Sequence, residues 1–128
     1  MSLTTRDLYR PVGLYELRLI QAAEYRAFPP RLETQPIFYP VLNLEYAIQI
    51  ARDWNTKDVQ SGYMGVATRF SVDAAYLDRF EVQTVGAIQH QELWIPADDL
   101  EEFNQHIQGV IHIEAAFYGE KFVGERKW

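Results

Sequence analysis

The sequence has 128 residues, of which 48% are hydrophobic and 14% aromatic, and this fits one domain with a real apolar core. The formal net charge is −6, which makes nonspecific nucleic-acid binding unlikely, because neutralising phosphates needs a surplus of Lys and Arg. The absence of cysteine excludes disulfides, thiolate nucleophiles and cysteine-ligated zinc. No apolar run approaches the ~20 residues of a membrane helix, so we expect a soluble cytoplasmic protein without membrane contact.

The first half of the chain alternates between strand and helix patterns. In chain order we expect strand 7–12, helix 14–25, an extended loop 26–36, strand 37–42 and helix 44–54. Pro11 confines the first strand to a sheet edge or to its own end, because proline has no N–H to donate. Three prolines prevent regular structure in the loop. Asn43 is predicted to cap the second helix.

Strands dominate the second half. We expect strand 63–72, a short helix 73–80 capped by Asp73, short strand 81–86, strand 91–96, acidic helix 97–107 and strand 110–118. This order predicts an α+β fold, a small split mixed or antiparallel sheet with two to four helices, rather than a parallel doubly wound sheet. We expect a single domain over 1–128, with a core of about 7–118 and a tail, 119–128, that is poorly ordered or packed on an edge.

No strong catalytic motif is present: the sequence lacks a glycine-rich dinucleotide loop, a P-loop, a serine nucleophile elbow and a zinc-binding H-E-x-x-H. Its three histidines, His90, His106 and His112, fall on separate predicted elements, so we expect no metal site. His106 lies on the acidic helix and is expected to be solvated. The strand pattern does not decide to which face of the sheet the His112 side chain points.

Arg10 lies inside the first predicted strand, where a buried guanidinium needs a carboxylate, water or a bound anion. Two interpretations stay open: an edge residue pointing outward, or a guanidinium fork for a phosphate or ribose. Arg26 and Arg31 flank Phe-Pro-Pro in the loop. We favour a solvated loop for them over a loop that closes on an anionic ligand.

Glu92 shares a strand side with Trp94, since both are even-numbered in a period-2 pattern. A carboxylate against an aromatic wall can orient a ligand hydroxyl or stabilise a cation. An edge-strand charge that discourages aggregation is the alternative. Phe38 and Tyr39 are adjacent, so they point to opposite faces, and one of them is expected to face a cleft or a second layer.

Several blocks of the sequence resemble known proteins, namely LYRPVG, FPPR, FYPVLN, IARDWN and ELWIPA. They are similar to a group of small uncharacterised bacterial proteins labelled "ADP-ribosylation/crystallin J1", over most of residues 8–118. The order of an Arg in the first strand, an aromatic strand with a following helix, and a late strand opening with Glu also resembles the ADP-ribosyltransferase-like layout. Where many members of that superfamily have Ser-Thr-Ser, this chain has Tyr39-Pro40-Val41.

The resemblance implies NAD as the substrate and assigns roles to six residues. Arg10 would anchor a phosphate or ribose, Tyr39 would stack on nicotinamide, and Glu92 would be the catalytic carboxylate beside the developing oxocarbenium centre. Tyr46, His90 and Gln91 would complete the binding site. The expected function is therefore NAD-dependent ADP-ribosyl transfer or a related NAD cleavage. The alternative is a noncatalytic module of the same fold that binds a nucleotide or a protein partner.

Overall fold

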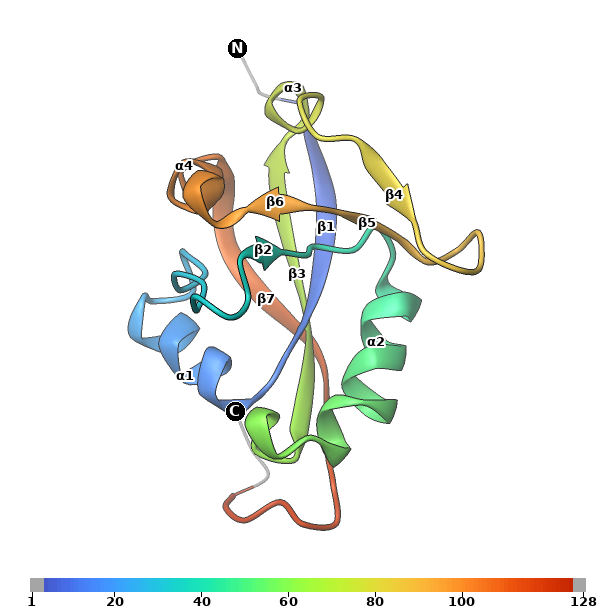
Figure 1. Ribbon diagram of the computed structural model, residues 1–128. Coiled ribbons are helices and arrows are strands. Elements are labelled where there is room, and N and C mark those ends of the chain that lie inside the picture. Colours follow the sequence, from blue (N-terminus) through green and yellow to red (C-terminus); the bar gives the residue numbers. More distant parts are fainter. Residues whose placement is uncertain (1–3, 126–128) are drawn as a thin grey trace.

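Three long antiparallel strands form the centre of the protein (Figure 1). The computed structural model describes residues 4–125. The strands are β1 (Thr5–Val12), β3 (Met64–Asp73) and β7 (Ile107–Tyr118), in the order β1-β3-β7. In this register Tyr9 lies opposite Arg69, and Arg69 lies opposite His112.

Shorter strands form two further pairs, of which one is bridged to this sheet. Strand β4 (Val82–Thr84) pairs with β5 (Gln91–Leu93), and β2 (Ile37–Phe38) pairs with β6 (Ile95–Pro96), both antiparallel. A single residue, Val41, links β5 to β1. Its backbone exchanges two hydrogen bonds with Tyr9, of 2.9 and 2.7 Å, and its other side lies opposite Glu92. Tyr9, Val41 and Glu92 therefore form one row on the same face of the sheet.

The main core lies on the other face. Leu8 and Val12 of β1 point into it, together with Leu17 and Ile20 of helix α1 (Leu14–Ala22). Four buried phenylalanine rings fill the centre, with centroids 4.8 to 6.2 Å apart in tilted and edge-to-face contacts; these are Phe28, Phe38, Phe70 and Phe103. Such pairs add about 0.5–1.5 kcal/mol each beyond burial of their area.

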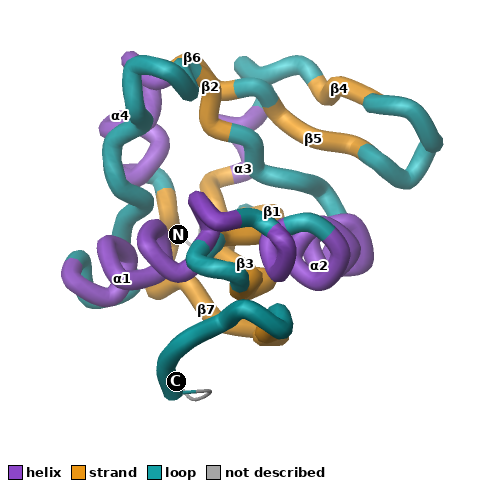
Figure 2. The backbone as a smooth tube through the Cα atoms, turned by 60° about the horizontal axis from the view of Figure 1, so that its bottom comes forward, coloured by secondary structure: helices purple, strands orange, loops and turns teal. Residues whose placement is uncertain are grey.

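Helix α2 (Leu44–Asp53) covers the second face with a smaller apolar cluster, in which Ala47 packs against Val41 and Ala67. The helix approaches β3 closely at Gly65, where an added Cβ would lie 2.3 Å from the carbonyl oxygen of Ala51. Figures 1 and 2 show α1 and α2 on opposite sides of β1. This arrangement gives the two faces of β1 different neighbours, which decides where the candidate site residues lie.

The described part of the chain is a small α+β fold, as the sequence predicts. Its other α-helices are short: α3 (Ala74–Leu77) and α4 (Leu100–Gln105), with 3-10 turns at Asn55–Lys57, Val59–Ser61 and Ala97–Asp99. Asn43 caps α2 as predicted, because its side chain accepts from the Tyr46 amide at 2.7 Å. No helix within residues 4–125 is long and apolar enough to span a membrane.

Several predicted boundaries are wrong. Helix α1 ends at Ala22 rather than Tyr25, because Glu24 and Tyr25 take left-handed backbone angles, with φ of 57° and 61°. The strand expected over 37–42 pairs only at 37–38 and again at Val41. The strand expected over 91–96 breaks at Trp94. The last strand begins at Ile107, three residues earlier than predicted.

Two predictions about polar groups near α3 differ from the structure. Asp73 is at the predicted N-cap position, but its side chain makes no capping hydrogen bond. Its carboxylate instead lies 2.8 Å from Nδ1 of His106 and accepts from Gln108 at 2.8 Å. His106 is therefore not simply solvated, and its ring also stacks on Tyr76 with centroids 3.9 Å apart.

The proline-rich loop 26–36 is irregular, as predicted, but it is anchored. Phe28 is buried in the main core, and the side chain of Asn104 accepts from its amide at 2.9 Å and donates to its carbonyl at 3.0 Å. In the tail, Phe122 packs edge-to-face on Tyr118 with centroids 4.9 Å apart. The rest of the predicted tail, residues 126–128, lies outside the described residues.

Candidate functional site

The first group of candidate residues gathers where β5 meets the N-terminus of α2. Asn43 connects these two segments: its Oδ1 caps the helix and its Nδ2 donates to the carbonyl of Gln89 at 2.6 Å. The Leu42 amide donates to the carbonyl of Gln91 at 3.0 Å. Tyr46, in the first turn of α2, is thereby held beside the side chain of Glu92.

Glu92 is held by two donors from different elements. Tyr46 donates its hydroxyl to Oε2 at 3.0 Å, and the indole N–H of Trp94 donates to Oε1 at 2.7 Å. The predicted common side of Glu92 and Trp94 is confirmed by this contact. Trp94 keeps 47% of its surface exposed, so a large flat ring stands at the open rim of the carboxylate.

His90 completes the group by stacking on Tyr46. Their ring centroids are 4.5 Å apart and the planes differ by 15°. The Nε2 atom of His90 lies 3.3 Å from Oε1 of Gln49, one turn along α2 from Tyr46. We call Tyr46, His90, Glu92 and Trp94 the Glu92 cluster.

The phenol of Tyr46 remains protonated far into the alkaline range. Its partial burial, the hydrogen bond to Glu92 and the negative charge of Glu92 raise the pKa of Tyr46 to about 12. At neutral pH the cluster therefore presents one carboxylate whose two donors, a phenol and an indole, are both uncharged.

Arg10 does not join this cluster. It is adjacent to Tyr9 on β1, and Tyr9 lies in the same row as Glu92, so the Arg10 side chain points to the opposite face. There it is 7% exposed and forms a two-pronged ion pair with Glu16, through Nε at 2.7 Å and Nη2 at 2.8 Å. Its guanidinium also lies over the Phe38 ring, 4.6 Å from the centroid.

Tyr39 and Gln91 also lie apart from the Glu92 side chain. The carbonyl of Tyr39 accepts from Nη1 of Arg10 at 3.3 Å. Phe38 is fully buried while Tyr39 is 41% exposed, so this pair does point to opposite sides. Gln91 precedes Glu92 on β5 and shares its side with buried Leu93. Arg10, Tyr39 and Glu92, to which the resemblance assigns roles in binding NAD, are therefore not brought together at one site.

The sequence interpretation missed Asn43 as the link between α2 and β5, and Gln49 as the neighbour of His90. Gln49 could have been found from helix geometry, since positions three apart share a face with Tyr46. The pairing of Arg10 with Glu16 had no such signal, because one residue is on a strand and the other on a helix.

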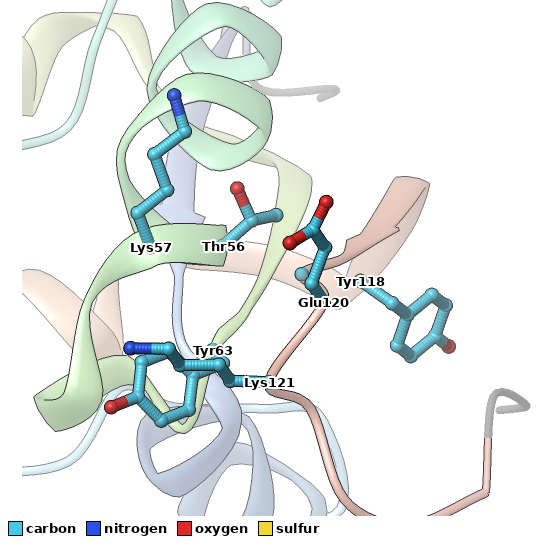
Figure 3. A pocket seen from close by; sticks show the side chains of 7 residues that line it. Thr56, Lys57, Tyr63, Tyr118, Glu120 and Lys121 are labelled. Atoms are coloured by element: carbon cyan, nitrogen blue, oxygen red, sulfur yellow. The ribbon is translucent and has the colours of Figure 1, made fainter.

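A separate cavity of about 420 Å³ opens at the far end of β3 and β7 (Figure 3). Its wall depends on Gly119, where an added Cβ would lie 1.9 Å from the carbonyl oxygen of Thr56. Lys121 lies over the ring of Tyr63, at 5.7 Å, while Lys57 points in another direction in this view. The two ammonium groups do not converge, so this cavity presents no shared cationic site.

Within residues 4–125 no group of three or more His, Asp or Glu side chains could hold a metal ion. Comparison of the chain with protein-family models, with curated proteins and with solved structures gives no significant match.

Proposed function

We propose that the protein binds a nucleotide, NAD or a related compound, through the Glu92 cluster and without cleaving it. The observation that carries the proposal is the Glu92 carboxylate, fixed by Tyr46 and Trp94 beside an exposed indole face. A carboxylate of this kind accepts hydrogen bonds from the two hydroxyls of a ribose. An exposed tryptophan ring offers a stacking surface for a base.

The carboxylate retains acceptor capacity after its two protein contacts. An ionised carboxylate has about four lone-pair sites, and Glu92 uses two of them for Tyr46 and Trp94. The remaining lone pairs can accept from a ligand without breaking either contact. Glu92 is already oriented before binding, which reduces the conformational entropy lost when a ligand binds.

The charges around the cluster favour the nucleoside part of such a ligand over its phosphates. Arg69, on the same face of the sheet, is paired with Glu114 at 2.5 Å, and Arg10 is paired with Glu16 on the other face. The chain as a whole carries a net charge of −6. We therefore expect adenosine or a nicotinamide riboside to contribute most of the affinity, which we expect to be modest.

NAD cleavage by an ADP-ribosyltransferase-like fold is the second candidate. It is favoured by the same carboxylate, because Glu92 could stabilise the positive charge that develops as nicotinamide leaves. The sequence resemblance points the same way. Against it, Arg10 offers no phosphate anchor on the face of Glu92. Binding therefore ranks above cleavage.

The test is a titration of the natural chain and of Glu92→Gln with NAD, adenosine and 2′-deoxyadenosine, followed by calorimetry or amide NMR shifts. We expect the variant to bind about tenfold more weakly, since a charged hydrogen-bond acceptor is lost. The matched control is Glu45→Gln, an exposed carboxylate next to Tyr46 in sequence, which should bind as the natural chain does.

Three results would count against the proposal: no binding of any of these ligands, equal binding by Glu92→Gln, or an equal loss in Glu45→Gln. Release of nicotinamide, measured in the same samples, decides between the two candidates. Release that depends on Glu92 would establish cleavage, and binding without release would establish recognition alone.

A further inference from the structure

A cavity of about 520 Å³ lies between α1 and the proline-rich loop, on the side of β1 that faces away from the Glu92 cluster. Its volume falls within the usual range for small-molecule sites, roughly 300–1,000 Å³. Much of its wall is apolar and accessible, formed by Tyr15, Leu19, Pro29, Pro30 and Leu32. The cavity also has a charged part, which consists of Glu16 and Arg31.

Glu16 and the two arginines that contact it, Arg10 and Arg31, together carry a net charge of +1. Arg10 occupies Glu16 with two short hydrogen bonds, of 2.7 and 2.8 Å. Arg31 lies against the same carboxylate, with Nη1 3.7 Å from Oε1 of Glu16, and its side chain is only 11% exposed. Two guanidinium groups thus share one carboxylate in a partly buried place, where an uncompensated charge is costly.

Arg31 is also held in position with unused donors. Its Nε donates to the carbonyl of Gln35 at 3.2 Å, and its Nη2 donates to Oε1 of the same residue at 3.3 Å. Its Nη1 makes no hydrogen bond to any residue within 4–125. Desolvation and the nearby charge of Arg10 lower the pKa of Arg31, and the shared Glu16 carboxylate offsets only part of this effect.

We propose that this cavity binds a small amphiphilic oxyanion, a carboxylate or phosphate on an apolar body, with Arg31 contacting the oxyanion. The guanidinium of Arg31 has the planar donors that suit either anion. Leu19, Leu32 and Tyr15 would contact the apolar body. The proposal is independent of the nucleotide site, since the two share no residue and lie on opposite faces of the sheet.

The same features limit the ligand to a compact molecule with a single anionic group. The net charge of −6 disfavours extended polyanions, because repulsion from the rest of the surface grows with each added charge. The unbalanced charge at Arg31 amounts to one, so one carboxylate neutralises it, and one phosphate monoester, with a charge of about −1.5 to −2 at pH 7, more than neutralises it. A neutral molecule of the same shape would contact the apolar wall of the cavity but would accept no charge-assisted hydrogen bond from Arg31.

The test compares 4-phenylbutyrate with the neutral alcohol 4-phenylbutanol, and phenyl phosphate with phenol, by amide NMR titration of the full chain. We expect each anion to bind about tenfold or more tightly than its neutral counterpart, with shifts around α1 and the loop. The relative affinity of the two anions tells which oxyanion the cavity prefers. Equal affinity of acid and alcohol would overturn the proposal, as would shifts elsewhere.

Arg31→Gln should remove that anion preference. Its matched control is Arg26→Gln, the exposed arginine on the other side of the same Phe-Pro-Pro segment, which does not line the cavity. Loss of binding in both variants, or in neither, would contradict the role of Arg31. Should Arg31→Gln fail to fold, Leu32→Ser decides: it should weaken phenylbutyrate but leave acetate unchanged, and unchanged phenylbutyrate affinity would contradict the cavity.

Discussion

Tyr46 donates its hydroxyl to Glu92 at 3.0 Å, across 46 residues of chain, and this contact connects helix α2 to strand β5. The same tyrosine stacks on His90, the residue just before β5. The connection explains why a partly exposed position of β5, paired with β4 on one side and bridged to Val41 on the other, carries an ordered carboxylate. Glu92 is positioned by a helix on the second face of the sheet, whereas Arg10 belongs to the main core on the first face.

Replacing Tyr46 with Phe tests how much this contact contributes to stability. The variant keeps the ring and its stacking on His90 but removes the donor to Glu92. We expect the free energy of unfolding to fall by about 1 kcal/mol, and the melting temperature by roughly 4 °C. Tyr15→Phe, on an exposed ring of α1, is the control and should melt as the natural chain does. An unchanged Tyr46→Phe variant would mean that the hydrogen bond contributes nothing.

Alkaline pH should weaken the fold through the same residue. The pKa of Tyr46 is raised to about 12 in the folded state, against about 10 for an unfolded chain. The stabilisation is therefore fully present below pH ~10 and is lost as pH rises from ~10 to ~12. Urea unfolding at several pH values should show the gap between the natural chain and Tyr46→Phe closing over this interval. A gap that stays constant would contradict the raised pKa.

The ion pair of Arg10 with Glu16 predicts that Arg10 stabilises the fold. The sequence alone did not decide between an outward-pointing Arg10 and one that binds an anion. In Glu16→Gln the buried guanidinium loses its carboxylate, so we expect the free energy of unfolding to fall by about 3 kcal/mol. The control, Glu33→Gln in the exposed part of the loop, should change it little. Replacing both partners, as Arg10→Met with Glu16→Leu, should recover only part of the loss, because Arg31 still lacks the Glu16 carboxylate.

The double replacement also separates stability from binding. Under the proposed function the Arg10→Met, Glu16→Leu chain should bind adenosine as the natural chain does, because neither residue lies on the face of Glu92. If the double variant binds adenosine more weakly than the natural chain, Arg10 or Glu16 contributes to the nucleotide site. That result would contradict the separation of the two faces.

The sequence predicted the features that depend on local patterns. The Asn43 cap of α2 and the shared side of Glu92 and Trp94 follow from spacing along one segment, and the structure confirms both. The end of α1 was misplaced because the left-handed turn at Glu24 and Tyr25 uses residues that rarely adopt it. No composition signal marks such a turn.

Long-range register accounts for the rest of what the sequence missed. Whether the side chains of Arg10 and Glu92 point to the same face of the sheet depends on the strand register that aligns Tyr9, Val41 and Glu92. A shift of that register by one residue would place Arg10 on the face of Glu92. Likewise, the contact of His106 with Asp73 could not be predicted from the local pattern around His106, because the two residues are 33 positions apart in the sequence. Side-chain pairs of this kind require the strands to be aligned before they can be recognised.

Gly119→Ala tests the close contact that closes the far end of the sheet beside the cavity in Figure 3. The added Cβ would lie 1.9 Å from the carbonyl oxygen of Thr56, so the backbone must shift. We expect a loss of about 3 kcal/mol in the free energy of unfolding, as for severe overpacking. Gly86→Ala is the matched control: its φ of +78° costs an L-residue about 1 kcal/mol, but its Cβ would meet open space. Equal losses in the two variants would show that backbone conformation, and not the approach of Gly119 to Thr56, dominates at this end of the protein.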